Sequence, residues 1–386
     1  MTLHYNADPL PNETIKQIND VIKRHKRPVF SKSMAFLVQD ISVVYTVYQL
    51  FNWVRYLAIF PEWILYPVYS MVVGIAATGL WVLGHECGHG SFGETIFQND
   101  IVGFIIHSAL LVPYFSWQYS HNKHHKYTNH LIHGETHVPD TKNGVSTVLR
   151  VMNVVGDDAF SIISVIGRLL VGWPLYLWFN FTGGRTGSDL TTRIDRSGPV
   201  DHFRPSSQTM PDRLASKVIL STVGCVGMVF LLIATGMVYD YIGPYLVINA
   251  WLVTLTWLHH TDPAVPHYGI GTEDQYNHTV GALCTIDRPY STFMDHFHHH
   301  IGSTHVAHHL NYGVPHYRAV QCTEELKLIL GDRYLYDPTP IWRAALNVAR
   351  ECVYVDGVDG VQYYKGVCGD NASPVPTAGT ASKKSD

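Results

Sequence analysis

The chain is poor in charged residues and in cysteine, and each shortage excludes a class of protein. Only 15% of the 386 residues are charged, against about 25% in ordinary soluble domains. The net charge is −4, so the sequence offers no basic surface for nucleic acid. The six cysteines include no Cys-x-x-Cys pair, which argues against a zinc ribbon or a disulfide framework. The N-terminus shows no basic segment followed by an apolar core, so no cleaved signal peptide is expected.

What the chain has instead is four long apolar segments, arranged in two pairs. The first pair is residues 34–59 and 64–84, and the second pair is residues 218–238 and 241–258. About 20 apolar residues cross the hydrocarbon core of a bilayer, so each pair is predicted to be a transmembrane helical hairpin. The fold class expected is therefore an all-α integral membrane protein. Two further apolar segments, 101–119 and 160–182, are interrupted by polar residues and prolines, so interfacial or re-entrant helices are as consistent with them as spans.

Basic residues give the two hairpins an orientation. A basic stretch at residues 23–32 precedes the first hairpin, and Lys123, Lys126 and Arg150 follow it. Because Lys and Arg accumulate on the cytosolic side of membrane proteins, both hairpins are predicted to begin and end in the cytosol. The expected organisation is a polar cytosolic segment at 1–33, a membrane domain at 34–360 and a flexible tail at 361–386.

Histidine is the most unusual feature of the composition. Of the 24 histidines, 21 fall within residues 85–137 and 259–316. Eight of them form three clusters, each placed after a predicted hairpin: His85 and His89; His121, His124 and His125; His305, His308 and His309. Residues three and four apart share one face of a helix, so each cluster can present its imidazoles toward a common point. Eight imidazoles exceed what one tetrahedral zinc ion needs, and we predict two metal ions in one cytosolic site.

Other interpretations of these histidines stay open at this point. His85-Glu86-x-x-His89 is also the motif of zinc proteases, with Glu86 as general base, but that interpretation leaves six clustered histidines unused. Glu86 can instead orient a ligand histidine by a hydrogen bond. A metal transporter is a second alternative, although it would place histidines within the membrane helices rather than beside them. His133 and His137 are candidates to support the ligands from outside.

The clusters and their neighbours resemble the membrane fatty acid desaturases, and within them the Δ12/ω3 acyl-lipid branch. The resemblance covers residues 35–360. It includes WVLGHECGH at 81–89, PYFSW at 113–117, HTDP at 260–263 and THVAHHL at 304–310. It implies a di-iron centre held by the eight cluster histidines and one more. His260 is the best positional match for this ninth ligand; His259, which stands where the family usually has glutamine, and His299 are its rivals.

The same resemblance implies O2-dependent insertion of a cis double bond into an acyl chain. Δ12 desaturation of oleoyl to linoleoyl is the first choice, with an ω3 (Δ15) desaturase and a 12-hydroxylase as alternatives. Acid–base catalysis contributes only about 10²–10⁴-fold and cannot break an unactivated C–H bond, so the chemistry needs a metal. The chain has no His-Pro-Gly-Gly haem motif; electrons are therefore expected from a separate cytochrome b5 and its reductase. The expected location is the endoplasmic reticulum membrane, and the acyl carrier, phospholipid or CoA, stays open.

Overall fold

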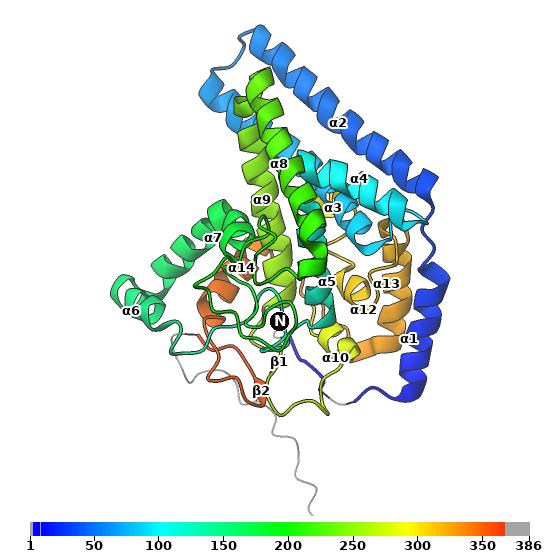
Figure 1. Ribbon diagram of the computed structural model, residues 1–386, viewed down its shortest axis with the longest axis vertical. Coiled ribbons are helices and arrows are strands. Elements are labelled where there is room, and N and C mark those ends of the chain that lie inside the picture. The colour runs from blue at the N-terminus through cyan, green and yellow to red at the C-terminus, as the bar shows by residue number, and fades with distance from the viewer. Residues whose placement is uncertain (1–2, 8, 367–386) are drawn as a thin grey trace, which may run out of the picture.

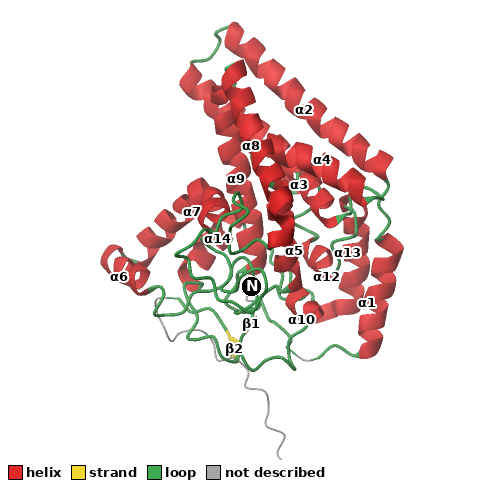
Figure 2. Cartoon of the chain, in the orientation of Figure 1, coloured by secondary structure: helices red, strands yellow, loops and turns green. Residues whose placement is uncertain are grey.

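The computed structural model describes residues 3–7 and 9–366, so most of the expected C-terminal tail lies outside the described residues. The described chain is largely helical (Figure 2). Its helices are α1 (Asn12–His25), α2 (Phe30–Tyr56), α3 (Glu62–His89), α4 (Ile96–Ala109), α5 (Tyr114–Lys126), α6 (Ser146–Val155), α7 (Asp157–Phe179), α8 (Ala215–Thr235), α9 (Val238–His260), α10 (His278–Ala282), α11 (Thr292–Phe297), α12 (His305–Leu310), α13 (His316–Leu330) and α14 (Ile341–Glu351), with 3₁₀ turns at Asp212–Leu214 and Gly331–Arg333. Two short antiparallel strands, β1 (His267–Tyr268) and β2 (Val361–Gln362), pair with each other.

Four of the long helices confirm the two expected hairpins. Helices α2 and α3 form the first hairpin and α8 and α9 the second, and all four are long and apolar enough to cross a membrane. The helix ends differ from the predicted ones by two to five residues, and two of these differences concern the histidines, because α3 continues to His89 and α9 to His260. A neutral imidazole does not interrupt a helix, and α3 ends only where Gly90 takes up a left-handed conformation at φ 70°. His85, His89 and His260 therefore lie on the last turns of membrane helices.

Helix α3 is the centre of the membrane domain. It packs against α2, α4, α5 and α9, and 72% of its apolar window is buried, against 11% for α2 and 22% for α8. The exposed side chains of α2 and α8 are mostly apolar, as expected of helices that face lipid. Figure 1 shows the loops and short helices gathered at one end of α8 and α9.

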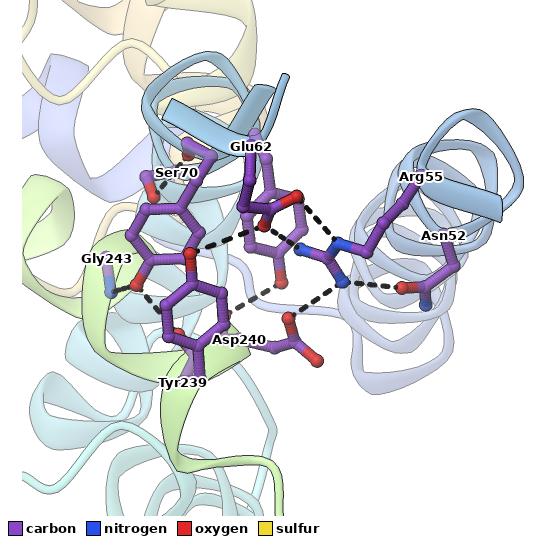
Figure 3. Close-up of polar contacts among 9 residues, drawn as sticks. Asn52, Arg55, Glu62, Ser70, Tyr239, Asp240 and Gly243 are labelled. Carbon is purple, nitrogen blue, oxygen red and sulfur yellow. Dashed lines mark hydrogen bonds and ion pairs between the residues drawn. The ribbon is translucent and has the colours of Figure 1, made fainter. Parts of the chain in front are cut away.

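The opposite ends of the two hairpins are joined by a polar cluster around Arg55. Its guanidinium lies 3.1 Å from a carboxylate oxygen of Glu62, at the start of α3, and 3.1 Å from Asp240, on α9. Figure 3 shows Arg55 of α2 directed toward both acids, with Asn52 completing its contacts. The cluster lies where α2 ends and where α3 and α9 begin, at the other end of α3 and α9 from their histidines, and it fixes the first hairpin against the second.

Helices α4 and α5 do not cross the membrane as a single span. They are joined by a bend of 107°. A crossing would place the first and second histidine clusters on opposite sides, yet the rings of His89 and His121 are only 4.8 Å apart. The pair is therefore re-entrant, one of the arrangements that the interrupted apolar pattern had left open.

Helix α7 also passes the length and composition test for a span, but both of its ends contact the same end of the molecule. Near its C-terminus, Tyr176 donates a hydrogen bond to Glu135 in the loop after α5. Near its N-terminus, Asp158 pairs with Arg350 of α14, a helix that packs on the histidine end of α9. An interfacial position explains why α7 still exposes Ile163, Ile166 and other apolar side chains.

The first 33 residues contain a helix that was not among the predicted elements. Helix α1 packs against α13, with Ile18, Val21 and Ile22 in a core cluster that includes Leu326. The i, i+3, i+4 spacing of these three residues was the available signal, but the polar residues around them obscured it.

Gly84 allows α3 to approach α4 closely, and this gives a first prediction. A Cβ atom at Gly84 would lie 2.3 Å from Cδ2 of the fully buried His107 ring. We therefore expect Gly84→Ala to destabilise the protein by about 1–3 kcal/mol. Gly227→Ala on α8 is the matched control, because a Cβ there meets nothing within 4 Å. Thermal unfolding of the two variants in detergent is the measurement, and equal melting temperatures would contradict this packing.

Candidate metal centre

Four separate helix segments deliver the predicted histidines to one place. The first cluster occupies the last turn of α3, the second lies on α5, and the third forms α12. His260 is the last residue of α9. All nine side chains are buried or half-buried, although His85 and His309 are 224 residues apart in the chain.

Five histidines from three helices form the first group. Their ligating nitrogens lie within 4.8 Å of one another, and the members are His85, His89, His121, His125 and His308. The Nε2 atoms are 3.2 Å apart in three pairs: His85 with His89, His121 with His125, and His125 with His308. Metal–nitrogen bonds of about 2.0–2.1 Å place neighbouring ligand nitrogens about 3 Å apart. This five-histidine group therefore has the geometry of a metal site.

A second group lies beside the first. His124, His260 and His309 have ligating nitrogens within 4.8 Å of one another. His305 completes a four-histidine group, because its Nε2 is 3.0 Å from that of His260. The two groups touch where the ring of His125 stacks on that of His309, with ring centroids 4.1 Å apart. Two metal ions held by these groups would be neighbours.

The rivals for the ninth position make other contacts. Nε2 of His259 lies 3.1 Å from the Tyr290 hydroxyl, and Nε2 of His299 lies 2.6 Å from the carboxylate of Asp40 on α2. Neither histidine belongs to a group of potential ligands. The geometry favours His260.

His133 and His137, the two candidates to support the ligands from outside, lie in different surroundings. The His137 ring lies parallel to the ring of His260, with centroids 6.0 Å apart. His133 instead lies against His130 and Tyr127. Of the two, only His137 is placed to support a member of the groups.

Glu86 is not directed at the converging nitrogens. Its Oε2 accepts a hydrogen bond from the backbone N–H of His316, at 2.9 Å, and lies 3.6 Å from Nδ1 of the same residue. A zinc protease needs this carboxylate at the metal-bound water, so the arrangement argues against that interpretation. It also shows no hydrogen bond from Glu86 to a cluster histidine.

Two residues outside the clusters hold their helices in place. Thr128 Oγ1 lies 3.1 Å from Nδ1 of His309, a contact that leaves Nε2 free to bind a metal. Asp287 accepts a hydrogen bond from the backbone N–H of Val306, at 2.8 Å, in the first turn of α12. Thr128 follows His124 by one helical turn, which was a usable signal, whereas nothing in the sequence around Asp287 singled it out.

Electrostatics keeps the third cluster neutral. Burial lowers the pKa of His308 to about 4, and the Glu86 carboxylate opposes this lowering. Burial and neighbouring imidazoles also lower the pKa of His305 and His309 well below the ordinary value. Neutral imidazole is the form that binds metal, so these side chains are ready to act as ligands at pH 7.

A second buried polar network lies beside the second cluster. The Tyr176 hydroxyl donates to Glu135 at 2.9 Å and contacts Oγ of Ser120 at 3.1 Å. Ser120 directly precedes His121 on α5. Burial raises the pKa of Glu135 to about 7, although Lys123 and the bond from Tyr176 act in the opposite direction. The network ties α5 to α7.

The raised pKa of Glu135 predicts a pH dependence of stability. Between about pH 4.5 and 7 the folded protein keeps a proton that the unfolded chain releases, so this group's contribution to stability falls as pH rises. Relative to Glu135→Gln, which stays neutral, the wild type should lose up to about 3 kcal/mol across this range. Unfolding curves of both proteins at pH 5 and pH 7 measure the difference. A constant difference would contradict the assignment.

Together, the hairpins and the grouped histidines indicate a multi-pass membrane protein with a histidine-rich site that can hold metal. Comparison with known proteins makes the class specific: residues 61–339 match the fatty acid desaturase family, and the chain belongs to it. It is 37% identical to a Delta(12) fatty acid desaturase of Calendula officinalis over 92% of each chain. It is 39% identical to a Delta(12) fatty acid desaturase of Mortierella isabellina, covering 81% of this chain and 78% of the relative. An oleoyl-12-hydroxylase of Ricinus communis is 36% identical, with 86% of this chain and 83% of the relative covered.

Proposed function

We propose that the chain is an acyl-lipid Δ12 desaturase that converts oleoyl to linoleoyl chains with O2. Family membership and the two similar Δ12 enzymes support the reaction and its position. The observation that carries the proposal is the convergence of nine histidines into two adjoining groups, built on the ends of the membrane helices α3 and α9 and on α5 and α12.

The donor set fits two iron ions. Nine neutral imidazoles suit iron, with His85, His89, His121, His125 and His308 holding one ion and His124, His260, His305 and His309 the other. Iron with O2 supplies the oxidising power that an unactivated C–H bond requires. The protein's own residues keep the imidazoles neutral, orient His309 through Thr128 and exclude bulk water by burial.

The stoichiometry of the reaction requires an electron donor. Removing two hydrogens from the acyl chain supplies two of the four electrons that reduce O2 to water. The other two must come from a partner, which we assign to cytochrome b5 and its reductase. The substrate is an acyl chain carried by phospholipid or CoA, which reaches the site at the membrane boundary.

The clusters lie on the cytosolic side in this proposal, and the membrane is that of the endoplasmic reticulum. The basic stretch at residues 23–32, before α2, supports this orientation. Residues 1–33 form the cytosolic N-terminal segment, 34–360 the membrane domain and 361–386 the tail.

Expression in a host rich in oleate, followed by fatty acid analysis, tests the function. Linoleate should appear with the wild type and be absent with His125→Ala. A 12-hydroxy product would favour the hydroxylase, which the Ricinus relative makes the second candidate. Conversion of supplied linoleate to an ω3 product, without any linoleate from oleate, would favour the ω3 alternative.

A further inference from the structure

The proposed di-iron centre poses a problem of charge. All nine proposed ligands are neutral, so two Fe²⁺ ions would bring four positive charges into a buried site. Burying uncompensated charge is costly. A fixed negative charge close to the ions would lower this cost and would favour the oxidised state over the reduced state.

Six carboxylates are buried among the described residues, and two of them are already paired with arginine. The six are Asp40, Glu86, Glu135, Asp201, Asp287 and Asp337. Asp201 pairs with Arg204 and Asp337 with Arg288. Of the remaining four, Glu86 is distinguished by its position, because it directly follows His85 and lines one small cavity together with His308. His85 and His308 both belong to the five-histidine group.

The structure also fixes the orientation of Glu86. Its Oε2 accepts the backbone N–H of His316, the first residue of the 15-residue helix α13, which has no side-chain cap of its own. A carboxylate at the start of a helix interacts favourably with the backbone N–H groups there. The contact therefore fixes the Glu86 carboxylate, supplied by α3, close to the first group.

A second carboxylate, that of Asp40, lies beyond His316 and His299. The ring of His316 lies 4.5 Å from that of His299, whose Nε2 is 2.6 Å from Asp40. Gly79 on α3 makes room for this pair, since a Cβ there would lie 2.9 Å from the Asp40 carboxylate and 3.3 Å from His299 Nε2. Asp40 is thus separated from the proposed ligands by two histidines, and one of them is its direct partner.

We propose that Glu86 is a positioning residue that supplies the compensating negative charge of the metal centre, and so raises its iron affinity and lowers its reduction potential. This inference rests on the proposed function, because it requires iron in the five-histidine group. The alternative is that Glu86 only caps α13. Gln in its place separates the two roles, since its carbonyl oxygen can still accept the His316 N–H while the charge is removed.

The test compares purified wild type, Glu86→Gln and Asp40→Asn after loading with Fe²⁺. For Glu86→Gln we expect the Fe²⁺ affinity, measured by competition with a chelator, to fall 10–100-fold. We also expect the midpoint potential to rise by the order of 59 mV, which is tenfold for one electron. Asp40→Asn should change the Fe²⁺ affinity and the midpoint potential in the same directions but less strongly. Asp40 is farther from the proposed ligands than Glu86 and is paired with His299.

Each outcome decides between the two roles. An unchanged affinity and potential in Glu86→Gln would overturn the proposal in favour of capping alone. If Glu86→Gln does not accumulate, Glu86→Asp and Asp40→Asn are compared with the wild type instead. Glu86→Asp should keep a near-native midpoint potential. An Asp40→Asn variant whose potential does not shift would contradict the proposed role of charge. If the wild type binds no iron, the proposed function itself fails, and this is seen before any variant is compared.

Discussion

Substitution of His260 by alanine is expected to lower linoleate formation more than 100-fold and to reduce bound iron from two ions to about one per chain. His260 Nε2 lies 3.1 Å from that of His124 and 3.0 Å from that of His305, so its loss removes the central member of the four-histidine group. Mutating a residue that hydrogen-bonds to a metal ligand typically lowers metal affinity or activity 10–100-fold. Removing the ligand itself should lower both by more. Product analysis in whole cells and elemental analysis of the purified protein measure the two effects.

The neighbouring residue provides the control for this prediction. His259 is equally buried but bonds the Tyr290 hydroxyl, and glutamine can keep a hydrogen bond to that hydroxyl. His259→Gln should therefore retain two irons and activity within a few-fold of the wild type. The assignment of the ninth ligand would be wrong if His259→Gln lost iron while His260→Ala kept it.

Substitution of Arg288 by methionine is expected to cause the largest loss of stability. Arg288 is 2% exposed and pairs with Asp337 and with Asp262, at 3.4 Å to the latter. Its Nε also donates to the backbone carbonyl of Leu258, at 2.9 Å, in the last turn of α9. Removing one partner of a buried ion pair leaves an uncompensated charge and costs about 3–5 kcal/mol. A large fall in melting temperature, or failure to accumulate in the membrane, is the expected observation.

Two further variants make the Arg288 prediction specific. Asp337→Asn in the Arg288→Met background should recover part of the lost stability, because it removes one of the stranded charges. Arg350→Met removes a pair with Asp158 that is largely exposed, and exposed pairs contribute little, so the melting temperature should hardly change. Equal losses in Arg288→Met and Arg350→Met would contradict the role of burial.

The sequence predicted the parts of this molecule that depend on local patterns. Four apolar runs predicted both hairpins, and the i, i+3, i+4 spacing of the histidines predicted which side chains would share a helix face. The position of the clusters after the hairpins predicted that they would meet. The structure then supplied the division into five and four histidines, which depends on how the ends of α3, α5, α9 and α12 approach one another.

The parts that could not be predicted depend on contacts between distant segments. Nothing in the sequence near Asp40 indicates that it meets His299, 259 residues further along the chain. The bond from Glu86 to the start of α13 likewise spans 230 residues. Composition alone makes α7 a candidate span, and only the contacts of Tyr176 and Asp158 show that both of its ends lie on one side.

The proposed chemistry depends on nine histidines that hold two metal ions in one site. Elemental analysis of the purified wild-type protein gives the metal content per chain. We expect two iron ions per chain. A single zinc ion per chain, or an iron content that does not fall when His125 or His308 is replaced by alanine, would contradict this expectation.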